Sequence, residues 1–515
     1  MAKNKLSEPE EQPVDIHGKP YNRGLMVALI LISTFAGMLM QTVLGTTLPT
    51  LMKDFNISMA TAQGATTWFL LANGIMVPVS AYFATRFSTK KLYIGAYSLL
   101  FIAILVAYAA PTSNYNIFII ARILQAMAVG ITMPLMQVVF VNIFPPKKMG
   151  AVMGMGGLVI GLAPAIGPTF AGWILDKNHV ILGITITNSW RTIFLLPLIA
   201  LGICLIFMPF IFRDVVPNKP MKLDLLSLVE AVIGFGLFLW GFTNVATDGW
   251  GSVGTVIVPI IVGVAVIALF ARRQLHMEQP FLDISVFKIK HFTLTTLTIA
   301  MVTMAMMGVE MMLPLYMQTV HSLTPLQSGL VLLPGALMMG IMSPVAGIAY
   351  DKVGARRLAI VGALILGLGT VPFMFFNLQT PEHFITVLYG MRMFGIAMIF
   401  MPLTASAMNI LPVEEVAHGT AANNTARQVA SAIGVALLAS VTQNVINNNT
   451  PAPHLRTTDP LVYASKMLHA ALDGYRVSFA IGMGFAVIAF IVALFLHKGK
   501  YVRPTSSTTT QGGEA

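Results

Sequence analysis

The strongest constraint in this sequence is a series of long apolar segments, each able to cross a lipid bilayer. One of them, LMVALILISTFAGMLM, runs from Leu25 to Met40 without a charged residue. With its flanks it reaches the roughly 17 to 25 residues that a helix needs to span about 30 Å of hydrocarbon. Runs this continuous do not fit a barrel of short, alternating strands. The sequence therefore predicts an all-α integral membrane protein.

Fourteen such segments follow one another along the 515 residues, of which 56% are hydrophobic and only 10% are charged. The predicted spans are 24–47, 62–84, 92–110, 115–142, 150–175, 190–212, 225–246, 252–271, 293–320, 326–349, 356–377, 383–410, 420–446 and 475–497. An even number of spans places both termini on the same side of the membrane.

The basic residues indicate which side that is. The formal net charge is +11, but the cations are distributed over short loops and span ends between apolar runs, and only Arg122, Arg392 and Arg427 fall well inside predicted spans. This is the positive-inside pattern, so we expect both termini in the cytoplasm and no nucleic-acid partner. The first 22 residues are polar and lack the pattern of a signal peptide, so the first span is expected to act as the insertion signal. One cysteine, Cys204, excludes internal disulfides and Cys-ligated metals.

Two pairs of similar segments indicate an internal duplication. The loop SAYFATRFSTKKL after the second span is similar to AGIAYDKVGARRL after the tenth, and RILQAMAVGITMP in the fourth span is similar to RMFGIAMIFMP in the twelfth. Spans 1–6 and 9–14 are thus predicted to be two six-helix halves related by pseudo-symmetry, with spans 7 and 8 inserted between them. The predicted divisions are an N-terminal tail (1–23), an N-terminal bundle (24–213), the inserted helices (214–274), a cytoplasmic linker (275–291), a C-terminal bundle (292–497) and a C-terminal tail (498–515).

Several motifs carry a resemblance to a known family. They are GIAYDKVGARR with Gly347, Asp351, Gly354, Arg356 and Arg357; RILQAMAVG with Arg122 and Gln125; GLAPAIGPTFAGW with Gly161, Pro164, Gly167, Pro168 and Gly172; and HGTAANNTARQVASAIG with Asn424, Arg427, Gln428 and Gly434. Together they resemble the major facilitator superfamily, in particular its fourteen-span drug/proton antiporter branch and the lincomycin-resistance type of exporter. The sequence departs from the family pattern at Thr85 and Ser88 in the first signature loop, which keeps Arg86, and at Met40, where many members have an acid.

The resemblance implies a multidrug exporter in the bacterial cytoplasmic membrane that exchanges drugs for protons. Such an exporter is driven by the proton gradient without a cofactor, acts on drug-like small molecules, is embedded in the lipid bilayer and works as a monomer. It also implies a role in proton coupling for Arg122. The alternative for Arg122 is a structural cation bonded to backbone carbonyls, and we interpret Arg392 and Arg427 mainly in that structural way.

Two of the motifs have a physical interpretation as moving parts. Pro164 and Pro168 each remove a helix hydrogen bond, while the nearby glycines let a neighbouring helix approach closely, so this span is expected to bend and pack tightly. We interpret the loop around Asp351 as a latch, because an acid at a helix end can exchange partners between a helix N-terminus and nearby cations as two halves rock.

Only two of the 20 acidic residues lie within predicted spans. Glu230 is near the start of span 7, where it can reach the headgroups, and we interpret it as an interfacial acid. Glu310 is about 18 residues into span 9, roughly 27 Å along the helix, in the outer half of the bundle. An ionised carboxylate is costly at such a depth, so Glu310 is the candidate proton carrier, with Arg122 or Arg392 as its partner.

The substrate cavity is expected between the two halves, around Glu310. Methionine is flexible and polarizable, which suits a pocket for unlike ligands, although methionine in a membrane span is more often ordinary packing. The predicted lining residues are Glu310, Met306, Met307, Thr303, Gln125 and Gln41.

The sequence favours a proton-coupled antiporter that exports hydrophobic drugs, cationic ones among them, by alternating access. A dedicated exporter of one physiological solute, such as a lipid precursor, peptide or amino acid, is the first alternative, and a non-transporting membrane sensor is the second. No enzyme is predicted, because the sequence shows no Ser/His/Asp, metal-binding or phosphate-loop constellation.

Overall fold

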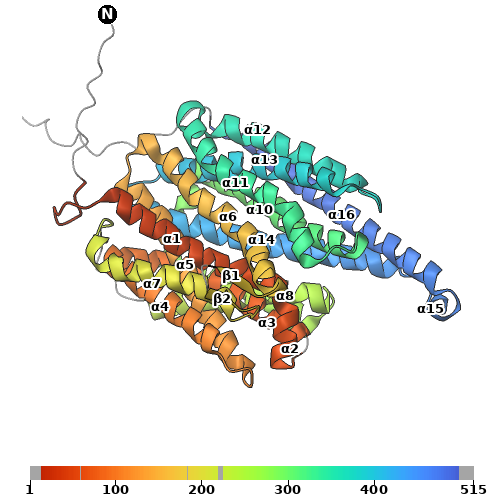
Figure 1. Ribbon diagram of the computed structural model, residues 1–515. Helices are drawn as coiled ribbons and strands as arrows, with labels where there is room; N and C mark the ends of the chain where they lie inside the picture. Colours follow the sequence, from red (N-terminus) through yellow and green to blue (C-terminus); the bar gives the residue numbers. More distant parts are fainter. Residues whose placement is uncertain (1–12, 58, 182–183, 218–223, 498–515) are drawn as a thin grey trace, which may run out of the picture.

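The computed structural model describes residues 13–57, 59–181, 184–217 and 224–497, and this part of the chain is almost entirely helical (Figure 1). In it, 14 helical segments are long and apolar enough to cross a membrane. The prediction of an all-α membrane protein with fourteen spanning helices is therefore confirmed. The predicted C-terminal tail and residues 1–12 of the predicted N-terminal tail lie outside the described residues.

The elements follow the predicted order along the chain. The first half contains α1 (Arg23–Thr42), α2 (Leu48–Phe55), α3 (Met59–Arg86), α4 (Thr89–Ala109), α5 (Tyr115–Ile143), α6 (Met149–Asp176), the strands β1 (His179–Ile181) and β2 (Ile184–Ile186), and α7 (Thr192–Ile211). The inserted helices are α8 (Leu225–Asp248) and α9 (Val258–Gln274). The second half contains α10 (Lys290–Val320), α11 (Pro325–Val353), α12 (Ala355–Thr370), α13 (Glu382–Asn409), α14 (Val416–Asn448), α15 (Leu455–Thr458) and α16 (Pro460–Leu494). The two strands form an antiparallel hairpin in which His179 pairs with Ile186.

Helix packing repeats between the halves, as expected for a duplicated fold. In the first half α3 packs on α5, α5 on α4, and α1 on α6 and α7. The second half repeats these contacts with α11 on α13, α13 on α12, and α10 on α14 and α16. This correspondence pairs α1 with α10, α5 with α13 and α6 with α14. We call the end of the bundle where α1 begins and α16 ends the tail face, and the opposite end the far face.

The halves meet along two pseudo-symmetric helix pairs, α6 with α11 and α3 with α14. In Figure 1, α6 lies between α1 of the first half and α11 of the second. The inserted helix α8 packs on α3 and α14 together, and α9 packs on α8. The inserted pair therefore covers one of the two seams between the halves and leaves the α6–α11 seam uncovered.

Small residues allow the close approach of α6 and α11. A β-carbon added at Gly154 would lie 2.6 Å from the Cα atom of Pro344, and one at Gly161 would lie 3.0 Å from the Met339 side chain. At the tail face the backbones of Gly150 and Gly347 are in direct contact. These glycines lie at four- and seven-residue spacings on α6, which places them on one helix face. Larger residues on this face would separate the two halves.

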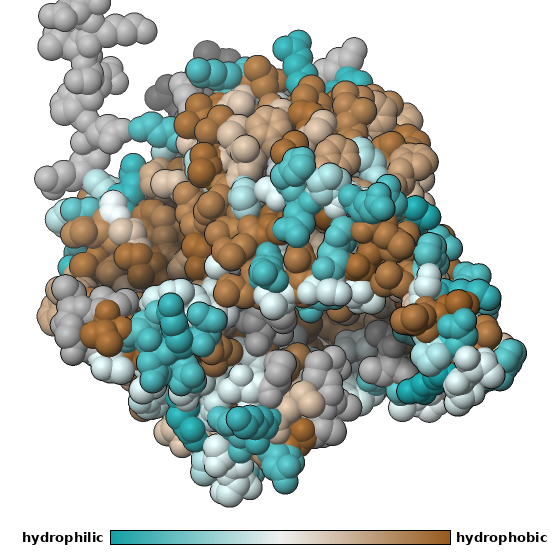
Figure 2. All heavy atoms as spheres, turned by 45° about the vertical axis from the view of Figure 1, so that its right-hand side comes forward, coloured by the Kyte–Doolittle hydropathy of each residue, from teal (hydrophilic) through white to brown (hydrophobic). Residues whose placement is uncertain are grey.

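Apolar side chains cover much of the outer surface, as Figure 2 shows for one face. Ile206 and Phe210 of α7 are 66% and 75% exposed, and Ile261 of α9 is 62% exposed. A soluble monomer rarely exposes apolar patches on this scale, whereas a lipid-facing surface requires them. The protein is a multi-pass membrane protein.

One end of each of two predicted spans is wrong. The first span was expected to run to residue 47, but α1 ends at Thr42, and the new helix α2 has Pro49 in its first turn. Proline is well tolerated in the first turn of a helix, where its missing N–H is not needed, so Pro49 favours the start of a new helix here. The last span was expected to begin at 475, but α16 begins at Pro460, where the Asp459 carboxylate accepts a hydrogen bond from the Val462 N–H at 3.1 Å. In Figure 1 the far-face ends of α14 and α16, joined by α15, extend beyond the neighbouring helices.

A polar contact fixes the inserted helices to one another at the tail face. The guanidinium of Arg273 donates to both carboxylate oxygens of Asp224, over distances of 2.9 and 3.1 Å. Because Asp224 precedes α8 and Arg273 lies near the end of α9, this bidentate pair joins the ends of the hairpin. The hydrogen bonds from Arg273 lower the pKa of the Asp224 carboxyl below its usual range.

Candidate proton and substrate site

Glu310 lies within α10, ten residues before the far-face end of that helix, a depth of about 15 Å. The helix continues without interruption through Pro314. The Oε2 atom of Glu310 is buried and has no hydrogen-bond partner among the described residues. A buried carboxyl oxygen without a partner is costly, so its presence at this depth calls for a functional explanation.

Arg392 of α13 is fully buried and contacts α10. Its Nη2 atom donates to the carbonyl oxygen of Ala305 at 3.1 Å, and its guanidinium lies 5.3 Å from the ring centre of Phe373. Its Nε and Nη1 atoms are buried without hydrogen-bond partners in the described part of the chain. One backbone bond and one aromatic ring thus leave most of this cation unsatisfied.

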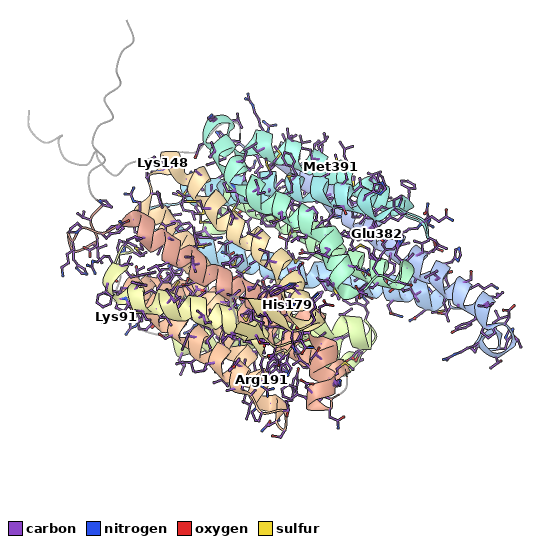
Figure 3. The ribbon with its side chains drawn as sticks, viewed as in Figure 1. Lys91, Lys148, His179, Arg191, Glu382 and Met391 are labelled. Carbon is purple, nitrogen blue, oxygen red and sulfur yellow. The ribbon has the colours of Figure 1, made fainter. Side chains whose placement is uncertain are left out.

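The structure distinguishes between the two arginines that the sequence left open as partners of Glu310. Arg392 donates to the Ala305 carbonyl of α10, the helix that carries Glu310, whereas Arg122 donates to Ala65 of α3 and Gln125 of α5. Within the described residues, Glu310 and Arg392 do not form a salt bridge in this conformation. Figure 3 places Met391, the neighbour of Arg392 in sequence, between Lys148 at the tail face and Glu382 toward the far face. Of the two arginines, Arg392 is therefore the one that contacts the helix of Glu310.

Arg122 of α5 belongs to a separate polar cluster in the first half. Its Nε atom donates to the Ala65 carbonyl at 3.4 Å, its Nη1 atom donates to Gln125 Oε1 at 2.6 Å, and its guanidinium lies 4.3 Å from the Phe69 ring centre. Gln125 in turn donates to the Ala103 carbonyl at 3.2 Å. In this conformation Arg122 links α5 to α3, and its partner Gln125 links α5 to α4.

The predicted cavity residues occupy three different places. Thr303 and Met306 are buried on α10, on the tail-face side of Glu310, and the Thr303 hydroxyl donates to the Ile299 carbonyl at 2.8 Å. Met307 is half-buried on the same helix. Gln125 is fully buried in the Arg122 cluster, and Gln41 is half-buried on α1 in the other half. The structure thus groups Thr303, Met306 and Met307 with Glu310 and places the two glutamines with the first half.

At the tail face, two contacts join the halves. The Asp351 carboxylate accepts hydrogen bonds from the N–H groups of Gly150 and Ala151, both at 3.2 Å. These N–H groups belong to the first turn of α6, so the acid lies at a helix N-terminus, where a negative charge is stabilised. The Asn424 Nδ2 atom donates to Gln137 Oε1 at 2.9 Å, which joins α14 to α5. We call the Asp351 contact the tail-face latch.

The other residues of the predicted motifs surround these contacts. Gly354 has φ of 81° and directly follows α11, a backbone conformation that favours glycine. Arg356 donates to the Leu494 carbonyl at 2.7 Å, while Arg357 and Arg86 are exposed. The guanidinium of Arg427 lies 4.8 Å from the Phe400 ring centre and donates to Asn424 at 3.4 Å. Gln428 packs near Gly74 of α3.

The predicted proline and glycine motif of α6 packs on both halves. Gly161 and Gly172 face Met339 and Leu326 of α11, and Gly167 faces Thr42. Pro168 lies within the continuous helix α6, and the side chain of Pro164 is outside the described part. Sequence reasoning did not identify Tyr389, Gln137 or the Ala305 carbonyl. Tyr389 had one available signal, its position three residues from Arg392 on the same helical face.

Comparison with known proteins shows similarity to membrane transporters of one superfamily. A model of the Major Facilitator Superfamily matches residues 30–435. The chain is 41% identical over 483 residues to the uncharacterized MFS-type transporter YcnB of Bacillus subtilis (strain 168), covering 94% of this chain and 97% of the relative. It is 38% identical over 484 residues to the lincomycin resistance protein LmrB of the same organism, covering 92% of this chain and 96% of the relative. The fold is similar to the crystal structure of the human organic anion transporter MFSD10, with a TM-score of 0.59 and 13% identity over 91% of this chain and 99% of that chain.

Proposed function

Because this chain belongs to the Major Facilitator Superfamily, we propose that it is a proton-coupled antiporter that exports hydrophobic drugs, cationic ones among them. The observation that carries the proposal is Glu310, a carboxyl group deep within a membrane-spanning helix, with one oxygen buried and unpartnered among the described residues. Such a group can hold a proton, release it and attract a cation. The relative named as a lincomycin resistance protein supports drugs as the substrate class.

The tail face is the cytoplasmic face in this proposal. Lys91, Lys148, Arg356 and Arg357 all lie at or near helix ends on that face, which fits the positive-inside rule. The protein then resides in the bacterial cytoplasmic membrane with both termini of the chain inside the cell. The proton gradient drives transport without a cofactor, and one chain forms the complete pathway.

Transport proceeds by rocking of the two halves about their shared seams. With the tail-face latch closed, the site is reached from the far face, where Glu310 takes up a proton. When the latch opens, Glu310 loses that proton to the cytoplasm as a drug binds between the halves. One carboxylate thus serves proton and drug in turn, and the exchange of the two ligands couples their opposite movements.

The proposal is tested by drug uptake into everted membrane vesicles with an imposed pH gradient. Acid inside the vesicle is expected to drive accumulation of a cationic dye and of a lincosamide, and the two should compete. Collapse of the gradient with a potassium/proton exchanging ionophore should abolish accumulation. Uptake that ignores the gradient would overturn proton coupling. Competition by one physiological solute alone would indicate a dedicated exporter, and the absence of any flux would indicate a sensor.

A further inference from the structure

We infer that Arg392 is the mobile counter-ion of Glu310, which rests on the Ala305 carbonyl while Glu310 holds a proton and moves onto the Glu310 carboxylate when that proton leaves. This inference rests on the proposed role of Glu310 as the proton carrier. It assigns to Arg392 a positioning role that is more than structural.

Glu310 and Arg392 both have buried polar atoms that lack hydrogen bonds in the present conformation. Glu310 has a buried oxygen without a partner, and Arg392 has two buried nitrogens without partners, among the described residues. The acid has a free hydrogen-bond acceptor and the cation has free donors, so a direct contact would provide hydrogen-bond partners for both. In the present conformation the two groups are not paired with one another.

Glu310 and Arg392 also lie at the same distance along their helices from the far face. Glu310 is ten residues from the far-face end of α10, and Arg392 is ten residues from the far-face end of α13. Both are thus about 15 Å along their helices from the same face. Helices α10 and α13 pack directly on one another, and the two groups already interact electrostatically.

Both proposed partners of Arg392, the Ala305 carbonyl and the Glu310 carboxyl, belong to α10. The Ala305 carbonyl and the Glu310 carboxyl are five residues apart on α10, about 7.5 Å along its axis. The long side chain of arginine can cover this distance by rotation about its own bonds. The ring of Phe373 offers the guanidinium a face in the resting position.

The proton step follows from this geometry. The Oε–H bond of Glu310 breaks and the proton passes to water, which leaves a carboxylate. Because an unpaired buried anion is unfavourable, the carboxylate draws Arg392 away from Ala305. A cationic drug that binds the carboxylate releases Arg392 again. Among the described residues, the charged and titratable groups that act on Glu310 are Arg392 and Tyr389, both on α13, and none comes from α14 or α16.

Arg122 supplies a matched comparison on the other half. It is also a fully buried arginine within a helix, with a buried nitrogen that lacks a partner among the described residues. Its contacts are with Ala65, Phe69 and Gln125 of the first half, so its charge should act on Glu310 much less than that of Arg392.

The experiment measures drug binding to the purified full-length protein at a series of pH values, with a fluorescent cationic dye as the probe. Wild-type binding is expected to fall as acid protonates Glu310. Without the counter-ion, the ionised form of Glu310 is less stable relative to the protonated form. Arg392→Gln should therefore raise the pH of half-maximal binding by about one pH unit or more. Arg392→Lys should restore part of the shift. Arg122→Gln tests the other candidate partner, because a shift as large as that of Arg392→Gln would assign the counter-ion role to Arg122 and overturn the inference.

The double variant Glu310→Gln/Arg392→Gln removes both charges and keeps the experiment decisive if Arg392→Gln alone is unstable. It should fold and show dye binding that does not depend on pH in this range. An Arg392→Gln profile that coincides with the wild type, or a double variant that keeps the Arg392→Gln profile, would overturn the counter-ion role. A Glu310→Gln variant with the wild-type pH profile would instead overturn the proposed function itself.

Discussion

Replacing Glu310 with glutamine is expected to abolish proton-driven drug accumulation, with a loss of about 100-fold or more relative to the wild type. Glutamine has nearly the same shape as glutamic acid and can still donate hydrogen bonds, but it can neither release a proton nor attract a cation. The competition between proton and drug would therefore disappear. The measurement is the initial rate of dye uptake into everted vesicles with an acidic interior.

Glu230 provides the matched control for this substitution. It is the other acid within a predicted span, and its Oε2 atom is also buried without a partner in the described part of the chain. It lies near the start of α8, close to the tail face, where Arg273 acts on it electrostatically. Glu230→Gln should keep uptake within about twofold of the wild type. A wild-type rate for Glu310→Gln would show that the proton is carried elsewhere.

Replacing Asp351 with asparagine is expected to weaken closure of the tail face and to lower drug exchange by about tenfold. The carboxylate of Asp351 accepts two hydrogen bonds from the first turn of α6, whereas asparagine carries no charge to interact with that helix terminus. A loss of about 1 to 2 kcal/mol shifts the balance between the closed and open states by roughly 5- to 30-fold. Uptake in vesicles and the reactivity of a cysteine introduced between the halves at the tail face measure the two effects.

The control for Asp351 is Glu414, an exposed acid on the same face. Glu414→Gln removes one negative charge from the tail face without touching α6, so it should change neither uptake nor cysteine reactivity. If Asp351→Asn and Glu414→Gln behave alike, the Asp351 contact is not a latch, and closure depends on the glycine contacts of α6 and α11 instead.

The number and order of the spanning helices could be predicted because hydropathy is a local property of the sequence. The ends of the first and last spans could not, since hydropathy does not report where a helix begins outside the membrane. The signals were nevertheless present. Pro49 is typical of the first turn of a new helix, and the pair Asp459 and Pro460 is typical of a helix start, with an N-cap acid followed by proline at the first helical position.

The candidate site was predictable only in part. Glu310 was identified because an acid at that depth in an apolar helix is costly whatever its neighbours. Its partner depended on how α10 and α13 pack, which a single sequence does not determine. Arg122 and Arg392 occupy similar places in the two repeats, so only the structure could assign Arg392 to Glu310 and Arg122 to Gln125.

The contacts between the halves were still harder to anticipate. Asn424 was flagged by its motif, but its partner Gln137 lies 287 residues away in sequence and in the other half. Asp351 was expected to interact with a helix N-terminus, and the structure shows that this is the N-terminus of α6. Both contacts join helices that are far apart in sequence and belong to different halves, so the sequence gives the residue types without the pairing.

The central claim is that one carboxylate, Glu310, is occupied in turn by a proton and by a drug. The most direct test is to count the protons released when the dye binds to the purified protein in weakly buffered solution, at a pH where the free protein is protonated at this site. The wild type is expected to release about one proton per dye molecule bound, and Glu310→Gln is expected to release none while Glu230→Gln behaves like the wild type. Equal proton release by Glu310→Gln and the wild type would contradict the account.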